Sequence, residues 1–300
     1  MNNHPQFSSQ SRFAAMLVGV LVAIPLCALA ATKTTNAAAA VAQKKSDAPM
    51  VVAPGSVFRW SAPGTKRCAM GGRSWSPIGE TCYFPVDLLQ KPGVLTVTRS
   101  STGRPESAKV TIEAFDYGTE EVNLPDIPQR DPAAADLKRV AREGALLSKV
   151  WRHKESPAQF ALPLGPVVKP MPPGKAFGVS RIFNGKPASQ PHMGTDYAAG
   201  PGVPVLAVAD GTVAIAQDLF YPGGAVIINH GDGLVTEAFH LSEMSVAPGA
   251  QVKKGQVVGK VGTTGRSTGP HLFFGVRWHN ARINPKWLLE DPAKMPAIHK

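Results

Sequence analysis

The sequence predicts a mainly β protein, with a smaller N-terminal β domain, a connecting helix and a C-terminal antiparallel β sheet or sandwich. Of the 300 residues, 29 are glycine and 28 are proline, while aromatic residues make up only 7%. This composition favours short strands and many turns over long helices. The hydrophobic share of 43% and the charged share of 18% are typical of a chain that folds around a core.

The N-terminal β domain is expected over residues 51–128. Short alternating or β-branched runs, at residues 94–98 and 109–115, are separated there by Pro-Gly and Ser-Thr-Gly turns. The same segment contains Cys68 and Cys82. In an exported protein such a pair indicates a disulfide, and two free thiols are the alternative.

A connecting helix is expected within residues 129–156. Asp131 is expected to cap its N-terminus, because an aspartate side chain can accept hydrogen bonds from the first turn, and Pro132 suits the first helical position. Apolar residues then recur at helical spacing as far as Trp151. This apolar stripe predicts that the helix packs between the two domains.

The second domain is expected over residues 157–300. It begins with a proline-rich connection, and β runs such as 203–208, 211–215 and 225–229 then alternate with Gly-Asp, Pro-Gly and Asp-Gly turns. No long helix is readable in this half of the chain. The pattern predicts an antiparallel sheet or sandwich of short strands.

The first 30 residues have the pattern of a secretory signal peptide. A largely polar start and Arg12 precede an apolar run, which ends in the small-residue cleavage pattern Ala28-Leu29-Ala30. We therefore expect an exported, periplasmic protein, with an uncleaved membrane anchor as the alternative. Residues 31–50, rich in alanine, threonine and lysine, are expected to form a flexible linker.

The formal net charge of +11 favours anionic surroundings such as wall polymers, phospholipid headgroups or nucleic acid. The lysines and arginines are scattered, without a basic run interleaved with aromatic residues. Nucleic acid is therefore not expected as a partner. Ordinary solubility charge is the simplest interpretation of this balance.

Four segments of the C-terminal half contain the residue types that catalysis requires. They are residues 191–196 (PHMGTD), 209–213 (ADGTV), 236–241 (TEAFHL) and 265–274 (GRSTGPHLFF). In order and spacing they resemble the lysostaphin-like (LytM-type) zinc peptidases of the bacterial cell wall. The resemblance covers roughly residues 176–289 and implies the fold of that family.

The resemblance implies a role for four residues. His192 and Asp196 stand at positions that bind zinc in the family, and His240 and His271 at positions of two active-site histidines that do not bind metal. Gly194 permits a bend that lets an imidazole and a carboxylate four residues apart converge. Neutral histidines can accept a proton from bound water and, once charged, stabilise an oxyanion. Outside this context, each would be interpreted as an ordinary surface, turn or core residue.

The third zinc position departs from the H-x-H pattern of the family, because the chain has His271-Leu272-Phe273. Residues two apart on a strand face the same side, so Phe273 takes the place of the ligand. Phenylalanine has no lone pair to donate, and a catalytic zinc normally has three protein ligands and a water. Zinc, the cofactor that the resemblance implies, is therefore expected to bind weakly through His192 and Asp196 alone.

Three functional hypotheses remain. The first is an exported peptidoglycan protein with an impaired peptidase-like domain, which takes part in or regulates peptidoglycan hydrolysis and binds another cell-wall hydrolase. The second is an active zinc endopeptidase that cleaves peptide cross-links of peptidoglycan. The third is a wall-binding protein without enzymatic activity. Peptidoglycan is the expected partner in each, and no small-molecule cofactor is expected.

Overall fold

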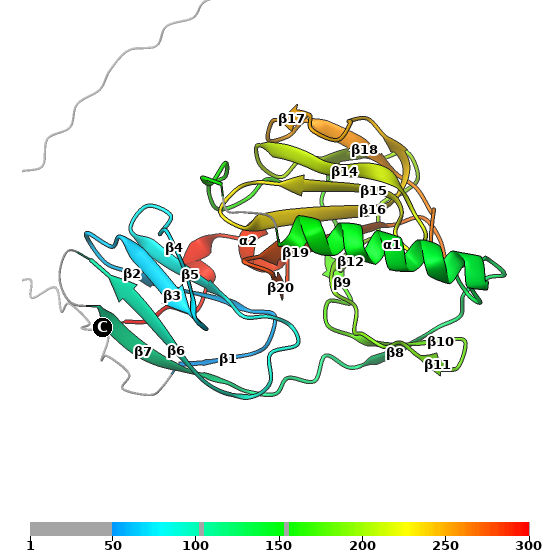
Figure 1. Ribbon diagram of the computed structural model, residues 1–300. Coiled ribbons are helices and arrows are strands. Elements are labelled where there is room, and N and C mark those ends of the chain that lie inside the picture. The colour runs from blue at the N-terminus through cyan, green and yellow to red at the C-terminus, as the bar shows by residue number, and fades with distance from the viewer. Residues whose placement is uncertain (1–49, 102–104, 153–155, 300) are drawn as a thin grey trace, which may run out of the picture. The chain divides into compact units, whose positions relative to one another are not determined.

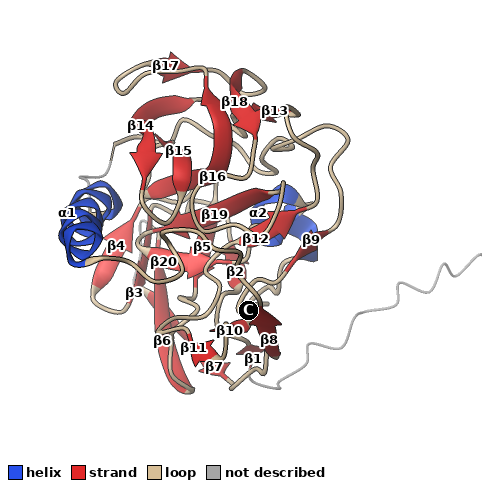
Figure 2. Cartoon of the chain, turned by 90° about the vertical axis from the view of Figure 1, so that its right-hand side faces the viewer, coloured by secondary structure: helices blue, strands red, loops and turns tan. Residues whose placement is uncertain are grey.

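The structure is a computed structural model that describes residues 50–101, 105–152 and 156–299. These residues fall within one compact unit, Lys45–Lys300. The expected signal peptide (1–30) and all but the last residue of the expected linker (31–50) lie outside the described residues. None of the described helices is both long and apolar enough to cross a lipid bilayer. Strands make up most of the regular structure (Figure 2), which confirms the mainly β fold class.

Two sheets share one core in the N-terminal part of the described chain. The larger sheet has the strand order β1-β7-β6-β3-β4, and β2 pairs with β5 in a separate two-stranded sheet. The strands are β1 (Met50–Val52), β2 (Val57–Ser61), β3 (Arg67–Met70), β4 (Arg73–Trp75), β5 (Thr81–Pro85), β6 (Gly93–Ser100) and β7 (Glu106–Ile112).

Aromatic rings and a disulfide hold the two N-terminal sheets together. Phe58 on β2 and Phe84 on β5 stack with their ring centroids 5.1 Å apart, and Trp60 beside them is fully buried. A disulfide joins Cys68 on β3 to Cys82 on β5, and both cysteines are fully buried in the same core. The disulfide is therefore a covalent link between the two sheets.

A three-stranded sheet crosses the expected domain boundary at residue 128. The strand β8 (Thr119–Val122) pairs in parallel with β10 (Ser180–Phe183), and β11 (Lys186–Pro187) adds an antiparallel edge. Backbone groups of a strand need hydrogen-bond partners, and β8 finds them on β10 rather than in the N-terminal sheets. Strands from both sides of residue 128 thus belong to one sheet (Figure 1).

A ten-stranded sheet dominates the C-terminal part. Its main path is β17-β14-β15-β16-β19-β12-β9, and β13, β18 and β20 pair at its sides. The strands are β9 (Gly174–Lys175), β12 (Thr195–Tyr197), β13 (Pro204–Leu206), β14 (Gly211–Leu219), β15 (Gly223–Asn229), β16 (Leu234–Met244), β17 (Gln251–Val252), β18 (Val257–Val261), β19 (Leu272–Trp278) and β20 (Ala281–Ile283). A short helix, α2 (Lys286–Leu289), and a 3-10 helix, Pro292–Lys294, follow.

Both faces of the middle strand β15 are covered. Successive side chains of a strand point to opposite faces, so Val226 and Ile228 enter the main core while Ile227 points the other way. The helix α1 (Ala134–Trp151) covers this second face and lies along β14, β15 and β16 (Figure 1). This double coverage explains why β15 is buried along nearly its whole length.

The apolar stripe of α1 packs on the ten-stranded sheet, so the expected packing between two domains is wrong. Leu147, Val150 and Trp151 pack against Ile215, Ile227 and Val235 of that sheet. In contrast, Leu137 remains 53% exposed and Leu146 36% exposed. No residue of the helix is fully buried. The helix is therefore attached mainly through its C-terminal half.

The cap of α1 also differs from the expectation. Ala133 is the capping residue, and its backbone N–H donates to the carboxylate of Asp136 at 3.1 Å. Asp131 lies outside the helix and pairs instead with Lys186 on β11 at 3.1 Å and with Arg130. A carboxylate in the first turn can satisfy the free N–H groups as well as a capping side chain can. Asp136 thus takes the role expected of Asp131.

Removing the disulfide should destabilise the N-terminal sheets. The replacement of both Cys68 and Cys82 by alanine frees a loop with a sequence separation of 14 residues. We expect a loss of about 3 kcal/mol in the free energy of unfolding, as for loops of this length. Denaturant unfolding of the oxidised wild type and the double variant measures this loss, with the reduced wild type as the control. Equal unfolding midpoints for all three samples would contradict the prediction.

Candidate functional site

The strands β12 and β19 position the residues expected to bind zinc. These strands pair antiparallel, with Asp196 directly opposite Phe273. His192 lies in the loop just before β12, and the backbone N–H of His192 donates to the carbonyl of Val179 at 2.9 Å. Directly opposite residues in such a pair have neighbouring side chains. The register thus places Phe273 next to Asp196.

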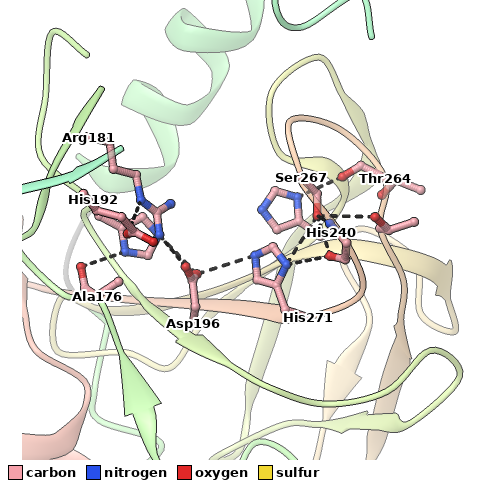
Figure 3. A network of polar contacts seen from close by, with 11 residues as sticks. Ala176, Arg181, His192, Asp196, His240, Thr264, Ser267 and His271 are labelled. Carbon is pink, nitrogen blue, oxygen red and sulfur yellow. Dashed lines mark hydrogen bonds and ion pairs between the residues drawn. The ribbon is translucent and has the colours of Figure 1, made fainter. Parts of the chain in front are cut away.

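Asp196 is the centre of the polar network in Figure 3. Its Oδ2 atom pairs with the guanidinium of Arg181 at 2.6 Å, and its Oδ1 atom lies 3.2 Å from Nε2 of His192 and 3.7 Å from Nε2 of His271. Burial by itself acts to raise the pKa of this carboxyl group. The neighbouring His192 and Arg181 outweigh burial and hold the pKa of Asp196 well below its ordinary value.

A strand irregularity aims His240 at the site. His240 has a φ of 64°, in the left-handed region that side chains other than glycine rarely adopt. The register between β15 and β16 shifts at this point, and the backbone N–H of His240 donates to the carbonyl of Pro222 at 2.8 Å. Such bulges redirect side chains, often beside functional sites. The bulge thereby turns the imidazole of His240 out of the strand's regular alternation.

His240 and His271 lie side by side with fixed ring orientations. Their ring centroids are 4.8 Å apart. Nδ1 of His240 donates to the carbonyl of Thr264 at 2.9 Å, and Nδ1 of His271 donates to the carbonyl of Gly269 at 2.9 Å (Figure 3). A carbonyl accepts only from a protonated nitrogen, so Nε2 of a neutral ring is left as an acceptor. Burial, with His271 as the next contribution, lowers the pKa of His240 to about 4.

The structure therefore brings together the four residues expected to form the site. Asp196 contacts both His192 and His271, and His271 lies beside His240. His192 and His240 also line one cavity. His230 does not take part, because Asp210 and Thr236 bind its two nitrogens. His279 does not take part either, since it stacks on Trp75 at the turn between β19 and β20.

Phe273 fills the space beside the two expected ligands. Its ring stacks on Phe239 at 4.9 Å between centroids and meets the edge of His192 at 5.1 Å. A Cβ added at Gly194 would collide with this ring, so the glycine leaves room for it. Phe273 is only 9% exposed. The ring of Phe273 is thus closely packed within the candidate site.

The residues present do not complete the zinc site of the resemblance. His192 and Asp196 offer a nitrogen and an oxygen donor, but Phe273 offers none. In the described residues, no group of three or more His, Cys, Asp or Glu side chains has the arrangement of a metal site.

A cavity of about 360 Å³ lies between α1 and the site. Leu147 and Trp151 of the helix form one wall, and His192, His240 and Phe273 belong to the opposite wall. Because the walls are mostly apolar side chains with a few polar groups, the cavity resembles an ordinary ligand pocket in size and character.

The helix reaches the site through a buried ion pair. Nε1 of Trp151 donates to the carboxylate of Glu237 on β16 at 2.6 Å. Arg277 on β19 pairs with the same carboxylate at 3.3 Å, and its guanidinium lies 3.7 Å above the ring of Trp151. The last turn of α1 is therefore fixed to the strands that carry the site.

Sequence reasoning missed several residues that shape the site. Arg181 lies 11 positions before His192, and nothing in its local sequence indicates that it binds Asp196. Arg266 stands within the GRSTGPH segment, but its role depends on aromatic rings from other strands. Glu237 stands within the TEAFHL segment, but its pairing with Arg277 and Trp151 depends on partners distant in the sequence.

The buried histidines make stability depend on pH. Burial lowers the pKa of His230 to about 4, and His240 has a similar value. The unfolded chain, with ordinary values near 6.5, binds more protons between these limits. The free energy of unfolding should therefore decrease as the pH falls from about 6.5 to about 4.

Two measurements check this prediction. Denaturant unfolding at a series of pH values gives the slope, and NMR titration of the imidazole resonances gives the pKa values directly. The urea-unfolded chain is the control for the ordinary value. The variant His230→Gln should have a shallower slope than the wild type. Protonation of His230 in the folded protein above pH 6 would contradict the prediction.

Comparison with known proteins finds a family match within the C-terminal part of the chain. The family described as Peptidase family M23 matches residues 190–285. A crystal structure of a putative peptidase M23 from Pseudomonas aeruginosa is 26% identical and covers 81% of this chain and 96% of that chain, with a TM-score of 0.61. Its likeness extends beyond the matched domain and supports the fold of most of the described chain.

Curated relatives match a smaller part of the chain. The DD-carboxypeptidase/endopeptidase Mpg of Neisseria meningitidis is 47% identical over 94 residues, which are 31% of this chain and 22% of that protein. The peptidoglycan DD-endopeptidase ShyA of Vibrio cholerae is 44% identical over 84 residues, which are 28% of this chain and 20% of that protein. The chain therefore spans about a fifth of the length of these relatives. These matches confirm the resemblance inferred from the sequence motifs: residues 190–285 match peptidase family M23, the LytM-type family.

Proposed function

We propose that this protein is exported to the periplasm, binds peptidoglycan through its M23 domain and regulates wall hydrolysis by another hydrolase rather than cutting peptides itself. The packing of Phe273 carries the proposal. Its ring lies where the family has a zinc ligand, against Phe239 and the edge of His192. Without a third ligand, a bound water cannot be activated as it is in zinc peptidases.

Peptidoglycan is the proposed ligand for two reasons. The relatives Mpg and ShyA are named as a DD-carboxypeptidase/endopeptidase and a peptidoglycan DD-endopeptidase, and the family match over residues 190–285 includes His192, His240 and His271. In addition, a net charge of +11 favours the anionic polymers of a cell wall. The cavity beside His240 provides room for part of a peptide.

An active zinc endopeptidase is the second candidate, and one observation favours it. Three possible donor atoms lie close together. Nε2 of His192 is 3.2 Å from Oδ1 of Asp196, and Nε2 of His271 is 3.7 Å from the same oxygen. Donor atoms of a tetrahedral zinc site lie roughly 3.4 Å apart when each bond is about 2.1 Å long. His271 is thus the residue that would act as a third ligand if the wild-type chain held zinc.

Zinc stoichiometry distinguishes the two candidates. After zinc loading and dialysis, the wild type should retain little metal, while the variant Phe273→His should retain about one zinc per chain, because it restores three donors. The variant Phe273→Leu is the matched control, since it changes the ring but adds no donor. If the wild type held nearly one zinc per chain and the variant His271→Gln lost it, the result would favour an active zinc endopeptidase over the proposed regulator.

Assays with purified sacculi test the proposed function itself. The purified protein should sediment with sacculi and release no peptides, with or without zinc. It should also increase the rate at which a purified wall amidase releases soluble fragments, and a chelator should leave this increase unchanged when the amidase is zinc-independent. Peptide release by the protein alone, abolished by chelator, would contradict the proposal. Absence from the sacculus pellet would contradict it as well.

A further inference from the structure

The guanidinium of Arg266 is held between two aromatic rings at the edge of the cavity. It lies 4.4 Å from the ring centroid of Phe183 on β10 and 4.6 Å from that of Tyr221. Such contacts hold a cation in place without neutralising it. Arg266 lines the 360 Å³ cavity and also a neighbouring cavity of about 320 Å³, together with His240. The side chain is therefore a fixed positive charge facing space that a ligand can enter.

Close backbone packing builds this position. The backbone N–H of Arg266 donates to the carbonyl of Tyr221 at 2.8 Å. Gly265, with a φ of 69°, and Gly223, with a φ of 67°, allow the two loops to touch, because a Cβ on either would collide with the other loop. The loop that carries Arg266 is also fixed to the active-site side by the hydrogen bond between His240 and Thr264. Arg266 is thus positioned as rigidly as the histidines are.

Every other charge on the first cavity is compensated by the protein. Glu237 pairs with Arg277, and Glu143 pairs with Arg139 at 2.6 Å and accepts from the backbone N–H of Phe220. Arg181 pairs with Asp196 at 2.6 Å and with Glu120 at 3.5 Å.

Arg266 alone lacks such a partner. Within residues 50–101, 105–152 and 156–299, no carboxylate lies within ion-pair distance of its guanidinium. Burial lowers the pKa of Arg266, and Arg181 contributes further to this decrease. Since an arginine side chain stays protonated in proteins, its charge persists and an anion is the ligand that satisfies it.

We propose that Arg266 binds the free C-terminal carboxylate of a peptide that lies in the cavity beside His240. The inference rests on the proposed function and extends it, because it names the group of the wall peptide that the site recognises. A guanidinium matches a carboxylate with two parallel hydrogen bonds. The apolar wall formed by Leu147, Phe239 and Phe273 suits the small apolar side chains next to such a terminus.

A pair of ligands that differ only in the terminal group tests the proposal. The probes are diacetyl-L-lysyl-D-alanyl-D-alanine, which has one free carboxylate, and the same peptide with a C-terminal amide. Isothermal calorimetry with the full chain should give about tenfold tighter binding of the acid than of the amide, since one charge-assisted hydrogen-bond pair is removed. In Arg266→Gln this preference should disappear, while the amide should bind as it does to the wild type.

Two further variants separate recognition from folding. Arg266→Lys keeps the charge but loses the planar fork, so it should retain only part of the preference for the acid. Arg130→Gln is the matched control, because Arg130 pairs with Asp126 and Asp131 away from the cavity, and it should behave as the wild type. Thermal unfolding shows whether each variant is folded.

The outcomes distinguish this inference from the proposed function. Equal affinity of the wild type for acid and amide, or an unchanged preference in Arg266→Gln, would overturn the carboxylate role and leave the binding of wall peptides intact. Failure of the wild type to bind either peptide or sacculi would overturn the proposed function and the inference with it. A loss of preference confined to the Arg266 variants supports the inference.

Discussion

The antiparallel pairing of β12 with β19 is the constraint on which the candidate site depends. It sets Asp196 directly across from Phe273, whose side chain belongs to the same face as that of His271 two residues earlier. A slip of one residue would turn this whole set to the opposite face. The register thus fixes Phe273 opposite Asp196, and the loop before β12 brings His192 to the edge of its ring. Phe273 is therefore part of the candidate site itself.

The largely buried carboxylate of Asp196 shows how the site is stabilised around that ring. A buried negative charge is costly unless a cation or hydrogen-bond donors compensate it. Here Arg181 lies 2.6 Å from one oxygen, and His192 lies 3.2 Å from the other. Side chains of the protein thus hold the charge of Asp196 in place. Phe273 adds apolar contact with Phe239 on the same side, which favours a folded, closely packed arrangement.

Local patterns in the sequence predicted the mainly β fold, because strand alternation and glycine-rich turns are local features, whereas the grouping of His192, Asp196, His240 and His271 was expected from the family resemblance. The same patterns failed where partners come from distant strands. The bulge that turns His240 depends on the pairing of β16 with β15, and the contact of Arg181 with Asp196 joins β10 and β12, which belong to different sheets. The cap of α1 was assigned to Asp131, since its ion pair with Lys186 is not visible in the sequence.

The polarity of the site supports a role beyond packing. A cavity that served only stability would be better filled by apolar side chains, because buried imidazoles lose their contacts with water. His240 is only 7% exposed, yet just one of its nitrogens is bound by the protein, and the ring lines both cavities. Arg266 likewise remains charged without a carboxylate partner among the described residues. Phe273 offers no metal donor, while these groups face the cavity, and that combination supports the proposed recognition of a polar peptide.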